Sequence, residues 1–300
     1  MNSNIEIFNE TQKLIKHDEF LRATTEKAVA ATKIYGEDYR SHRNPDNATK
    51  VRFQEALTLM PAFKFACERK RVAVLNFANP TTPGGGVLNG ANAQEEYLCR
   101  ATSLYNCLNS PAASDFYKLH RQIASRNNNG NMFLGTDQVI FSPDVPVLRV
   151  DKGYIPDDVC NPVQSLLRKD MWYHVDMITC AAPYFASKTF LIPDGDLERL
   201  FMRRIRNIFE VAINNHVQHI ILGAFGCGAF NNPSMIVAGA FSKLLRQERY
   251  SKAFSEVVFA VKRTGRFCEN IEAFQSAFSV FPPISPHPIC PESNKRRFFE

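Results

Sequence analysis

Arg71-Val-Ala-Val-Leu-Asn-Phe-Ala-Asn79 runs directly into Pro80-Thr-Thr-Pro-Gly-Gly-Gly86, and this stretch decides the fold. Its apolar run is short and partly β-branched, which predicts a buried strand. The Pro/Gly segment predicts a loop at the carboxyl end of that strand, and a helix is expected from about 92 to 108. A strand that passes through a glycine loop into a helix is typical of an α/β protein.

The rest of the chain repeats this alternation of strands and helices. Further strands are predicted at 131–141, 147–150, 174–182, 219–222 and 256–261. Helices are predicted at 9–34, 51–68, 195–214, 232–247 and 267–278, and loops at 40–50 and 124–130. The order predicts an α/β sandwich with a largely parallel sheet. We expect one domain over 1–280, with an N-terminal helical extension over about 1–70, and a Pro-rich, charged tail over 281–300.

Composition and charge restrict the class of protein. The 300 residues are 45% hydrophobic and 22% charged, which is typical of a globular chain. The net charge of +6 weakly favours a polyanionic partner. The chain has no zinc-finger spacing, RNA-binding signature or long basic run, so we predict no direct binding of nucleic acid. The cluster Arg203, Arg204 and Arg206 is predicted to be a solvated helix face.

Cysteine and histidine spacing predicts neither disulfides nor a metal site. The eight cysteines are scattered without a CxxC pair, which favours buried free thiols in a reducing compartment. No histidine has ligand spacing, so no metal or other cofactor is expected. No signal peptide and no apolar run near twenty residues is evident, which predicts a cytoplasmic protein (or a nuclear one in a host with a nucleus) without membrane contact. We expect a monomer.

The glycine triplet is the first candidate for a binding site. It leaves a backbone without side chains at the carboxyl end of a strand, where ligands approach open α/β sheets. Such a loop can turn its N–H groups onto phosphate oxygens. A plain tight turn would need glycine equally, and the triplet alone does not separate the two interpretations.

The residues Gln94-Glu95-Glu96 follow this loop after a short spacer. Asn92 is predicted as the N-cap of the next helix, which puts Glu95 at the capping-box position three residues later. Glu96 lies about 100° further around the helix and has no such structural explanation. An isolated Glu-Glu pair is more often surface charge, but this pair lies in the first turn of a helix beside a glycine loop.

A second glycine-rich loop is Gly223-Ala-Phe-Gly-Cys-Gly-Ala-Phe-Asn-Asn-Pro233. It follows the strand predicted at 219–222 and ends in Asn232 and Pro233, which we expect as N-cap and first helical residue. Two such loops on neighbouring strands would hold a diphosphate between them. Phe230 is available to pack on a ribose or base, whereas core packing is favoured for Phe225. Phe259 is a weak candidate for an adenine pocket, since strand-core packing is favoured for it too.

These motifs resemble a known family. Asn79-Pro-Thr-Thr-Pro-Gly-Gly-Gly-Val87 with Gln94-Glu95-Glu96 is similar to the signature of poly(ADP-ribose) glycohydrolases, and this combination is highly specific. The loop Gly226-Cys-Gly-Ala-Phe230 resembles their diphosphate-binding loop, a weaker signal by itself. Phe141-Ser-Pro-Asp-Val-Pro-Val147 is similar to a segment of the microbial-type branch. By motif order the resemblance covers roughly residues 10–280.

The resemblance implies a macrodomain-like fold, a three-layer α/β/α sandwich with a mixed, largely parallel sheet. It implies a substrate, which would be ADP-ribose or poly(ADP-ribose) on modified proteins. Binding to the distal ribose and diphosphate is implied for Asn79, Gly84, Gly85, Gly86, Val87 and Gln94. Binding to the other side of the diphosphate is implied for Gly226, Cys227, Gly228 and Ala229. Phe230 would pack on the distal ribose, Glu95 would hydrogen-bond a ribose hydroxyl, and Glu96 would be the catalytic acid/base.

The implied reaction cleaves the ribose–ribose O-glycosidic bond. One carboxyl group serves both proton transfers if it begins protonated. Glu95 and the substrate's diphosphate would favour the protonated form of Glu96, whereas the helix N-terminus would favour the carboxylate. The sequence does not decide between these effects.

Three alternatives compete with this interpretation. A non-catalytic ADP-ribose reader would use the same loops, although it has no need for Gln94-Glu95-Glu96. A hydrolase of single ADP-ribose groups on protein or nucleic acid would differ in loops that we cannot place. A Rossmann-type NAD(P) enzyme is disfavoured, because neither loop matches G-x-G-x-x-G after the first strand.

Overall fold

A computed structural model gives the structure of residues 3–127, 132–150, 166–186, 192–263 and 269–279. The strands are β1 (Lys33–Tyr35), β2 (Lys50–Gln54), β3 (Val72–Phe77), β4 (Met132–Phe133), β5 (Val139–Val147), β6 (Tyr173–Cys180), β7 (Tyr184–Phe185), β8 (His219–Leu222) and β9 (Glu256–Ala260). The helices are α1 (Ser3–His17), α2 (Glu19–Ala31), α3 (Leu59–Cys67), α4 (Gln94–Ala101), α5 (Leu104–Leu108), α6 (Ser114–Arg126), α7 (Asp194–Asn214), α8 (Ser234–Leu245), α9 (Glu248–Ser251) and α10 (Glu269–Phe278). A 3₁₀ turn, η1 (Val87–Asn89), precedes α4.

The central sheet has seven strands in the order β1-β5-β6-β3-β8-β9-β2, and β4 and β7 form a separate pair. The strands from β6 to β2 in this order run parallel, whereas β5 is antiparallel to both β1 and β6. The predicted mixed, largely parallel α/β sheet is therefore confirmed.

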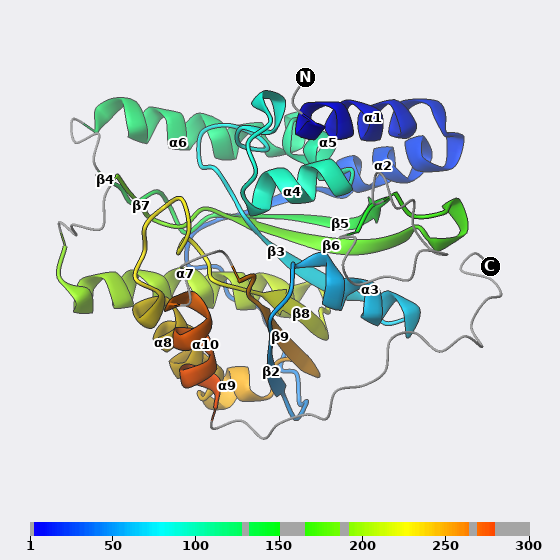
Figure 1. Ribbon diagram of the computed structural model, residues 1–300. Coiled ribbons are helices and arrows are strands. Elements are labelled where there is room, and N and C mark those ends of the chain that lie inside the picture. The colour runs from blue at the N-terminus through cyan, green and yellow to red at the C-terminus, as the bar shows by residue number, and fades with distance from the viewer. Residues whose placement is uncertain (1–2, 128–131, 151–165, 187–191, 264–268, 280–300) are drawn as a thin grey trace.

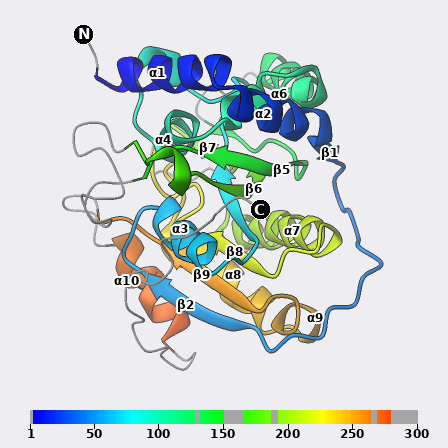
Figure 2. The same cartoon turned by 90° about the vertical axis from the view of Figure 1, so that its right-hand side faces the viewer.

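Helices cover both faces of this sheet (Figures 1 and 2). Ala73 and Leu75 of β3 point into a core shared with α7, α8 and α10. Val72 and Val74 of the same strand point into a second core, which includes residues of α1 to α6. Because side chains alternate along a strand, a short apolar run such as β3 supplies both cores.

The predicted N-terminal helix over 9–34 is wrong at its end and in its continuity. α1 ends at His17, and Asp18 begins α2 by accepting a hydrogen bond from Leu21 N–H at 3.0 Å. Residues 33–35 form an edge strand, paired with 139–141 of β5. The apolar spacing in this region is compatible with a helix, but pairing with a distant strand decides its conformation.

The predicted helix over 51–68 is also wrong in its first half. Residues 50–54 form β2, which pairs in parallel with β9, and α3 begins only at Leu59. The predicted helix over 92–108 is interrupted at Thr102, which bridges to Val147 and accepts a hydrogen bond from Leu104 N–H at 3.0 Å. The helices α6 and α9 were not predicted.

The predicted strand over 131–141 divides into β4 and the start of β5. Between them the backbone is held by side chains instead of a neighbouring strand. Arg204 Nη2 donates to Leu134 O at 2.8 Å, and Thr136 N–H donates to His120 Nε2 at 3.2 Å. The interpretation of Arg204 as part of a solvated face is therefore wrong. It is fully buried and its Nε lies 3.1 Å from Asp137 Oδ1.

The predicted strand over 147–150 is wrong, because β5 ends at Val147 and only Arg149 beyond it makes an isolated bridge, to Leu166. The other strand and helix predictions agree with β3, β6, β8, β9, α7, α8 and α10 to within a few residues. Cys67, Cys99, Cys107 and Cys180 are buried and free, and Cys227 is half-buried and free. Cys160, Cys268 and Cys290 lie outside the described residues. Phe225 and Phe259 are fully buried core residues, so the adenine role of Phe259 is wrong. No helix in the described part of the chain is long and apolar enough to cross a membrane.

Candidate active site

Two glycine-rich loops leave the same end of the sheet. We call residues 80–86, after β3, the first glycine loop and residues 223–233, after β8, the second glycine loop. β3 and β8 are parallel neighbours, so the chain leaves both strands at one edge (Figure 1). The Phe77 and Phe225 rings lie 5.6 Å apart and join the starts of the loops. This edge is where open α/β sheets bind ligands.

Glycine is required in the first glycine loop. Gly84 and Gly85 have φ angles of +69° and +58°. A Cβ atom on Gly85 would lie 2.3 Å from Glu96 Oε1 and 3.0 Å from Glu95 Oε2. The loop backbone therefore approaches both carboxyl groups closely, which a plain tight turn would not demand.

Glu96 faces the first glycine loop and is only 7% exposed. Its Oε1 accepts a hydrogen bond from Gly86 N–H at 2.8 Å, and its Oε2 accepts one from Ala93 N–H at 3.0 Å. Ala93 is the N-cap of α4, which makes Glu96 the third residue of the helix. The predicted cap at Asn92 with Glu95 as its partner is therefore wrong, and Glu96 has the capping position.

Glu95 is buried beside the same loop. Its Oε2 accepts a hydrogen bond from Asn79 N–H at 2.7 Å, and its Oε1 accepts one from Asn76 Nδ2 at 3.3 Å. Burial raises the pKa of Glu95 to about 8, although these two hydrogen bonds act in the opposite direction. Burial thus favours the protonated form of Glu95.

Gln94 and Asn79 fix the backbone around the two carboxyl groups. Gln94 Nε2 donates to Leu75 O at 2.8 Å, and its Oε1 accepts from Phe77 N–H at 2.9 Å. The Gln94 amide thereby binds α4 to the edge of β3. Asn79 Oδ1 accepts from the N–H groups of Thr81 and Thr82, both at 2.9 Å. Contact of Gln94 and Asn79 with substrate stays a prediction.

The second glycine loop is held by buried contacts at Gly226 and is exposed at Gly228 and Ala229. Gly226 has a φ of +75°, and a Cβ there would lie 2.4 Å from Ala182 Cβ. Asn232 Nδ2 donates to Gly226 O at 2.9 Å and to Pro183 O at 2.7 Å. Asn232 is therefore a loop brace, and its predicted N-cap role is wrong because Pro233 occupies that position. Gly228 and Ala229 are exposed, and a Cβ on Gly228 would meet nothing within 4 Å.

Phe230 is half-buried at the end of the second glycine loop. Tyr184 packs edge-on against its ring at a centroid distance of 5.5 Å. The backbone carbonyl of Phe230 accepts a hydrogen bond from Phe185 N–H at 3.2 Å. The partly exposed ring is thus held in place by β7.

The comparisons with known proteins agree with this geometry. The family "Microbial-type PARG, catalytic domain" matches residues 3–150. The structure is similar to poly(ADP-ribose) glycohydrolase from Thermomonospora curvata, with a TM-score of 0.76 and 29% identity over 93% of this chain and 100% of that chain. The chain is therefore similar to microbial-type poly(ADP-ribose) glycohydrolases in sequence over its first half and in structure over most of its length.

Two further structures of this family carry ligands. The Thermomonospora curvata enzyme bound to the inhibitor ADP-HPD has a TM-score of 0.75 and 28% identity, with coverage of 93% and 100%. The enzyme from Deinococcus radiodurans in complex with ADP-ribose has a TM-score of 0.69 and 28% identity, over 85% of this chain and 96% of that chain. No match was found among curated proteins.

Sequence reasoning missed several residues that shape this candidate site. Asn76 lies inside β3, and Arg100 is buried in α4. Tyr184 follows the carboxyl end of β6, so the rule that ligands approach that edge would have selected it. For Asn76 and Arg100 the only signal is a polar residue in a buried element, which needs a partner.

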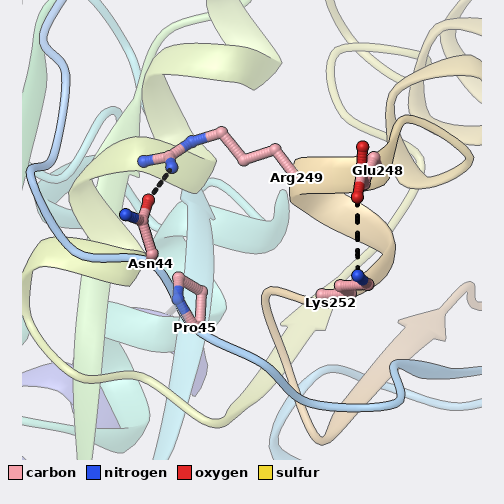
Figure 3. Close-up of a pocket in the computed structure, with 5 residues that line it drawn as sticks. All are labelled: Asn44, Pro45, Glu248, Arg249 and Lys252. Atoms are coloured by element: carbon pink, nitrogen blue, oxygen red, sulfur yellow. Dashed lines mark hydrogen bonds and ion pairs between the residues drawn. The ribbon is translucent and has the colours of Figure 1, made fainter.

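A separate hollow of about 390 Å³ lies at the opposite, amino end of β2 (Figure 3). It is lined by Asn44, Pro45, Glu248, Arg249 and Lys252. Arg249 donates to Glu210 Oε2 at 2.7 Å and to Asn44 Oδ1 at 3.2 Å, so its guanidinium binds the segment before β2 to α7. No predicted site residue lines this hollow. Among the described residues no group of three or more His, Cys, Asp or Glu could hold a metal ion.

Replacing Glu95 with glutamine is expected to stabilise the protein at alkaline pH. Because the pKa of Glu95 is raised to about 8 by folding, the native state binds more protons than the unfolded state between about pH 4.5 and 8. The free energy of unfolding of the wild type therefore falls as pH rises through this window, whereas the variant lacks this titrating group and does not show the fall. The Tm difference between Glu95→Gln and wild type, measured by calorimetry, should grow as pH rises from about 4.5 to about 8. The exposed Glu6→Gln is the control, and equal pH profiles for both variants would contradict the prediction.

Proposed function

We propose that this protein hydrolyses the ribose–ribose O-glycosidic bond of poly(ADP-ribose) and releases ADP-ribose, with Glu96 as acid/base and without a metal ion. One observation carries the proposal. A buried carboxyl group lies against the backbone of a glycine loop, at the sheet edge where a second glycine loop opens. Similarity to the poly(ADP-ribose) glycohydrolases supports the same reaction, because ADP-ribose and ADP-HPD are the ligands of the related structures.

The two loops would hold the diphosphate of the terminal ADP-ribose unit. Backbone N–H groups are the donors that glycine loops offer to phosphate oxygens. The first glycine loop and Val87 would bind one side, and Gly226, Cys227, Gly228 and Ala229 would bind the other. Phe230 would pack on the distal ribose and press its anomeric carbon toward Glu96. The clamp contributes binding and orientation, and the carboxyl group performs the proton transfers.

Glu96 would act twice in one turnover. Its proton passes to the departing ribose oxygen as the glycosidic bond breaks and oxocarbenium character develops on the distal ribose. The resulting carboxylate then takes a proton from the water that attacks the anomeric carbon, which restores the acid. Each oxygen of Glu96 accepts one backbone hydrogen bond, and a carboxylate oxygen has two lone-pair directions. One direction on each oxygen is left for the reacting groups.

Glu95 would support this reaction as a largely neutral acid. A protonated carboxyl group donates a hydrogen bond to a ribose hydroxyl, which a carboxylate does not. Its neutrality also limits the pair Glu95 and Glu96 to at most about one negative charge near pH 7. A diphosphate entering the clamp therefore meets less repulsion than two carboxylates would exert.

The test is incubation of the protein with purified poly(ADP-ribose), with products separated by chromatography. Release of free ADP-ribose that continues in excess chelator supports the proposal. Binding of the polymer without products would favour an ADP-ribose reader instead. Release from a mono-ADP-ribosylated protein but not from the polymer would favour a mono-ADP-ribosyl hydrolase. Activity that disappears with chelator and returns with a divalent ion would contradict the metal-free mechanism.

A further inference from the structure

We infer that α1 is a positioning element of the active site, in which Thr11 and Arg100 together fix the loop that holds Glu96. The inference rests on the proposed function for its catalytic readout. α1 lies beside α4 and η1 and packs into the same core as α4 (Figure 1). The family match also begins at residue 3, so it includes α1.

Arg100 fixes the connection between the first glycine loop and α4. Its side chain is buried although it belongs to the last turn of the helix. Its Nη1 donates to Ala91 O and its Nη2 donates to Asn92 Oδ1, both at 2.6 Å. The planar guanidinium thus holds two consecutive residues, which a lysine ammonium would not match.

The connection held by Arg100 in turn fixes Gly86. Ala91 N–H donates to Gly86 O at 3.1 Å. A Cβ on Gly86 would lie 2.8 Å from Ala91 Cβ, so the two backbones are in close contact. Gly86 N–H is the group that donates to Glu96 Oε1. A chain of direct contacts therefore runs from Arg100 to the proposed catalytic carboxyl group.

Thr11 connects α1 to the backbone of Arg100. Its hydroxyl is fully buried and donates to the backbone carbonyl of Arg100 at 2.7 Å. This carbonyl is among the last four of α4, which have no partner within their own helix. Thr11 Oγ1 also accepts a hydrogen bond from Arg149 Nε at 2.9 Å, which orients the hydroxyl toward α4.

Two further contacts of α1 are made to residues next to the first glycine loop. Asn4 Nδ2 donates to Gly90 O at 3.0 Å. The Phe8 ring packs edge-on against Tyr105 at 5.1 Å, and the Tyr105 ring lies 2.8 Å from the position of a Cβ on Gly84. α4 has only eight residues, and helices this short depend on packing for their position. The placement of Glu96 is therefore set in part by α1.

The experiment compares three threonine variants on poly(ADP-ribose). Thr11→Val removes the hydroxyl at nearly constant volume, and we expect kcat to fall about tenfold with KM within about twofold, because small misplacements of a catalytic group cost rate. Thr11→Ser keeps the hydroxyl and should restore kcat to within about twofold of wild type. Thr32→Val is the matched control. It removes a buried hydroxyl of the same N-terminal region, which contacts Ala28 O and Ser142 Oγ but not α4.

The outcomes separate positioning from general stability. Equal kcat for Thr11→Val and wild type, or an equal loss of kcat in Thr32→Val, would overturn the inference. If Thr11→Val does not fold, Arg100→Lys replaces it and is expected to lose kcat to a similar extent. Hydrogen exchange of the 84–96 peptide provides a readout without turnover. Faster exchange in Thr11→Val but not in Thr32→Val supports the inference, whether or not the wild type releases ADP-ribose. Failure of the wild type to release ADP-ribose would contradict the proposed function instead.

Discussion

Replacing Glu96 with glutamine is expected to reduce the release of ADP-ribose by at least about 10³-fold, because general acid/base catalysis by one group contributes on this scale. Glutamine has nearly the same shape and keeps one acceptor oxygen, which can accept from Gly86 N–H as Glu96 Oε1 does at 2.8 Å, although the hydrogen bond from Ala93 N–H to Oε2 is lost. It cannot give a proton to the leaving oxygen or take one from water. The first glycine loop should therefore keep its conformation while both proton transfers are lost.

Binding should separate this loss of catalysis from a loss of structure. We expect ADP-ribose affinity of Glu96→Gln to stay within about tenfold of wild type, or about 1.4 kcal/mol, by isothermal titration calorimetry. Glu248→Gln is the matched surface control and should retain turnover, because Glu248 lines the separate hollow at the amino end of β2. Turnover by Glu96→Gln at the wild-type rate would remove Glu96 from the mechanism.

The parts of the fold that were predicted correctly are those in which local sequence and tertiary structure agree. β3 and β8 are short apolar runs that lead into glycine-rich loops, and each lies where its own pattern indicates. The errors come from segments whose partners lie far along the chain. β1 pairs with 139–141, and β2 pairs with 256–260. A periodicity counted within one window contains no information about such partners.

The prediction of the site shows the same division. Motif order predicted a site at both glycine loops and both glutamates, and the structure brings the loops together at one sheet edge. The assignment of individual contacts failed at the cap of α4, where Ala93 replaces Asn92 and Glu96 replaces Glu95. Asn92 instead accepts a hydrogen bond from Arg100, a residue that the first turn of the helix does not reveal. Side-chain roles near a helix start depend on one residue of register, which sequence patterns determine poorly.

Replacing Gly85 with alanine is expected to reduce turnover by at least about 10²-fold, because it displaces the proposed catalytic carboxyl group of Glu96 while the fold survives. The new Cβ would lie 2.3 Å from Glu96 Oε1, and this oxygen ends a flexible side chain, so the carboxyl group moves instead of the core. The φ of +58° at Gly85 adds a backbone cost of about 1–2 kcal/mol for alanine. The variant should therefore unfold at a modestly lower temperature and retain its circular dichroism spectrum.

Gly36→Ala provides the matched control for Gly85→Ala. A Cβ on Gly36 would meet nothing within 4 Å, and Gly36 has no positive φ. Its kcat should equal that of wild type. The absence of a side chain at Gly85 lets the Glu96 carboxyl group lie against the loop, and the same absence would leave the loop open to the proposed diphosphate. Full turnover by Gly85→Ala would show that this close approach is not needed for catalysis, and would leave the triple glycine with a role in chain reversal alone.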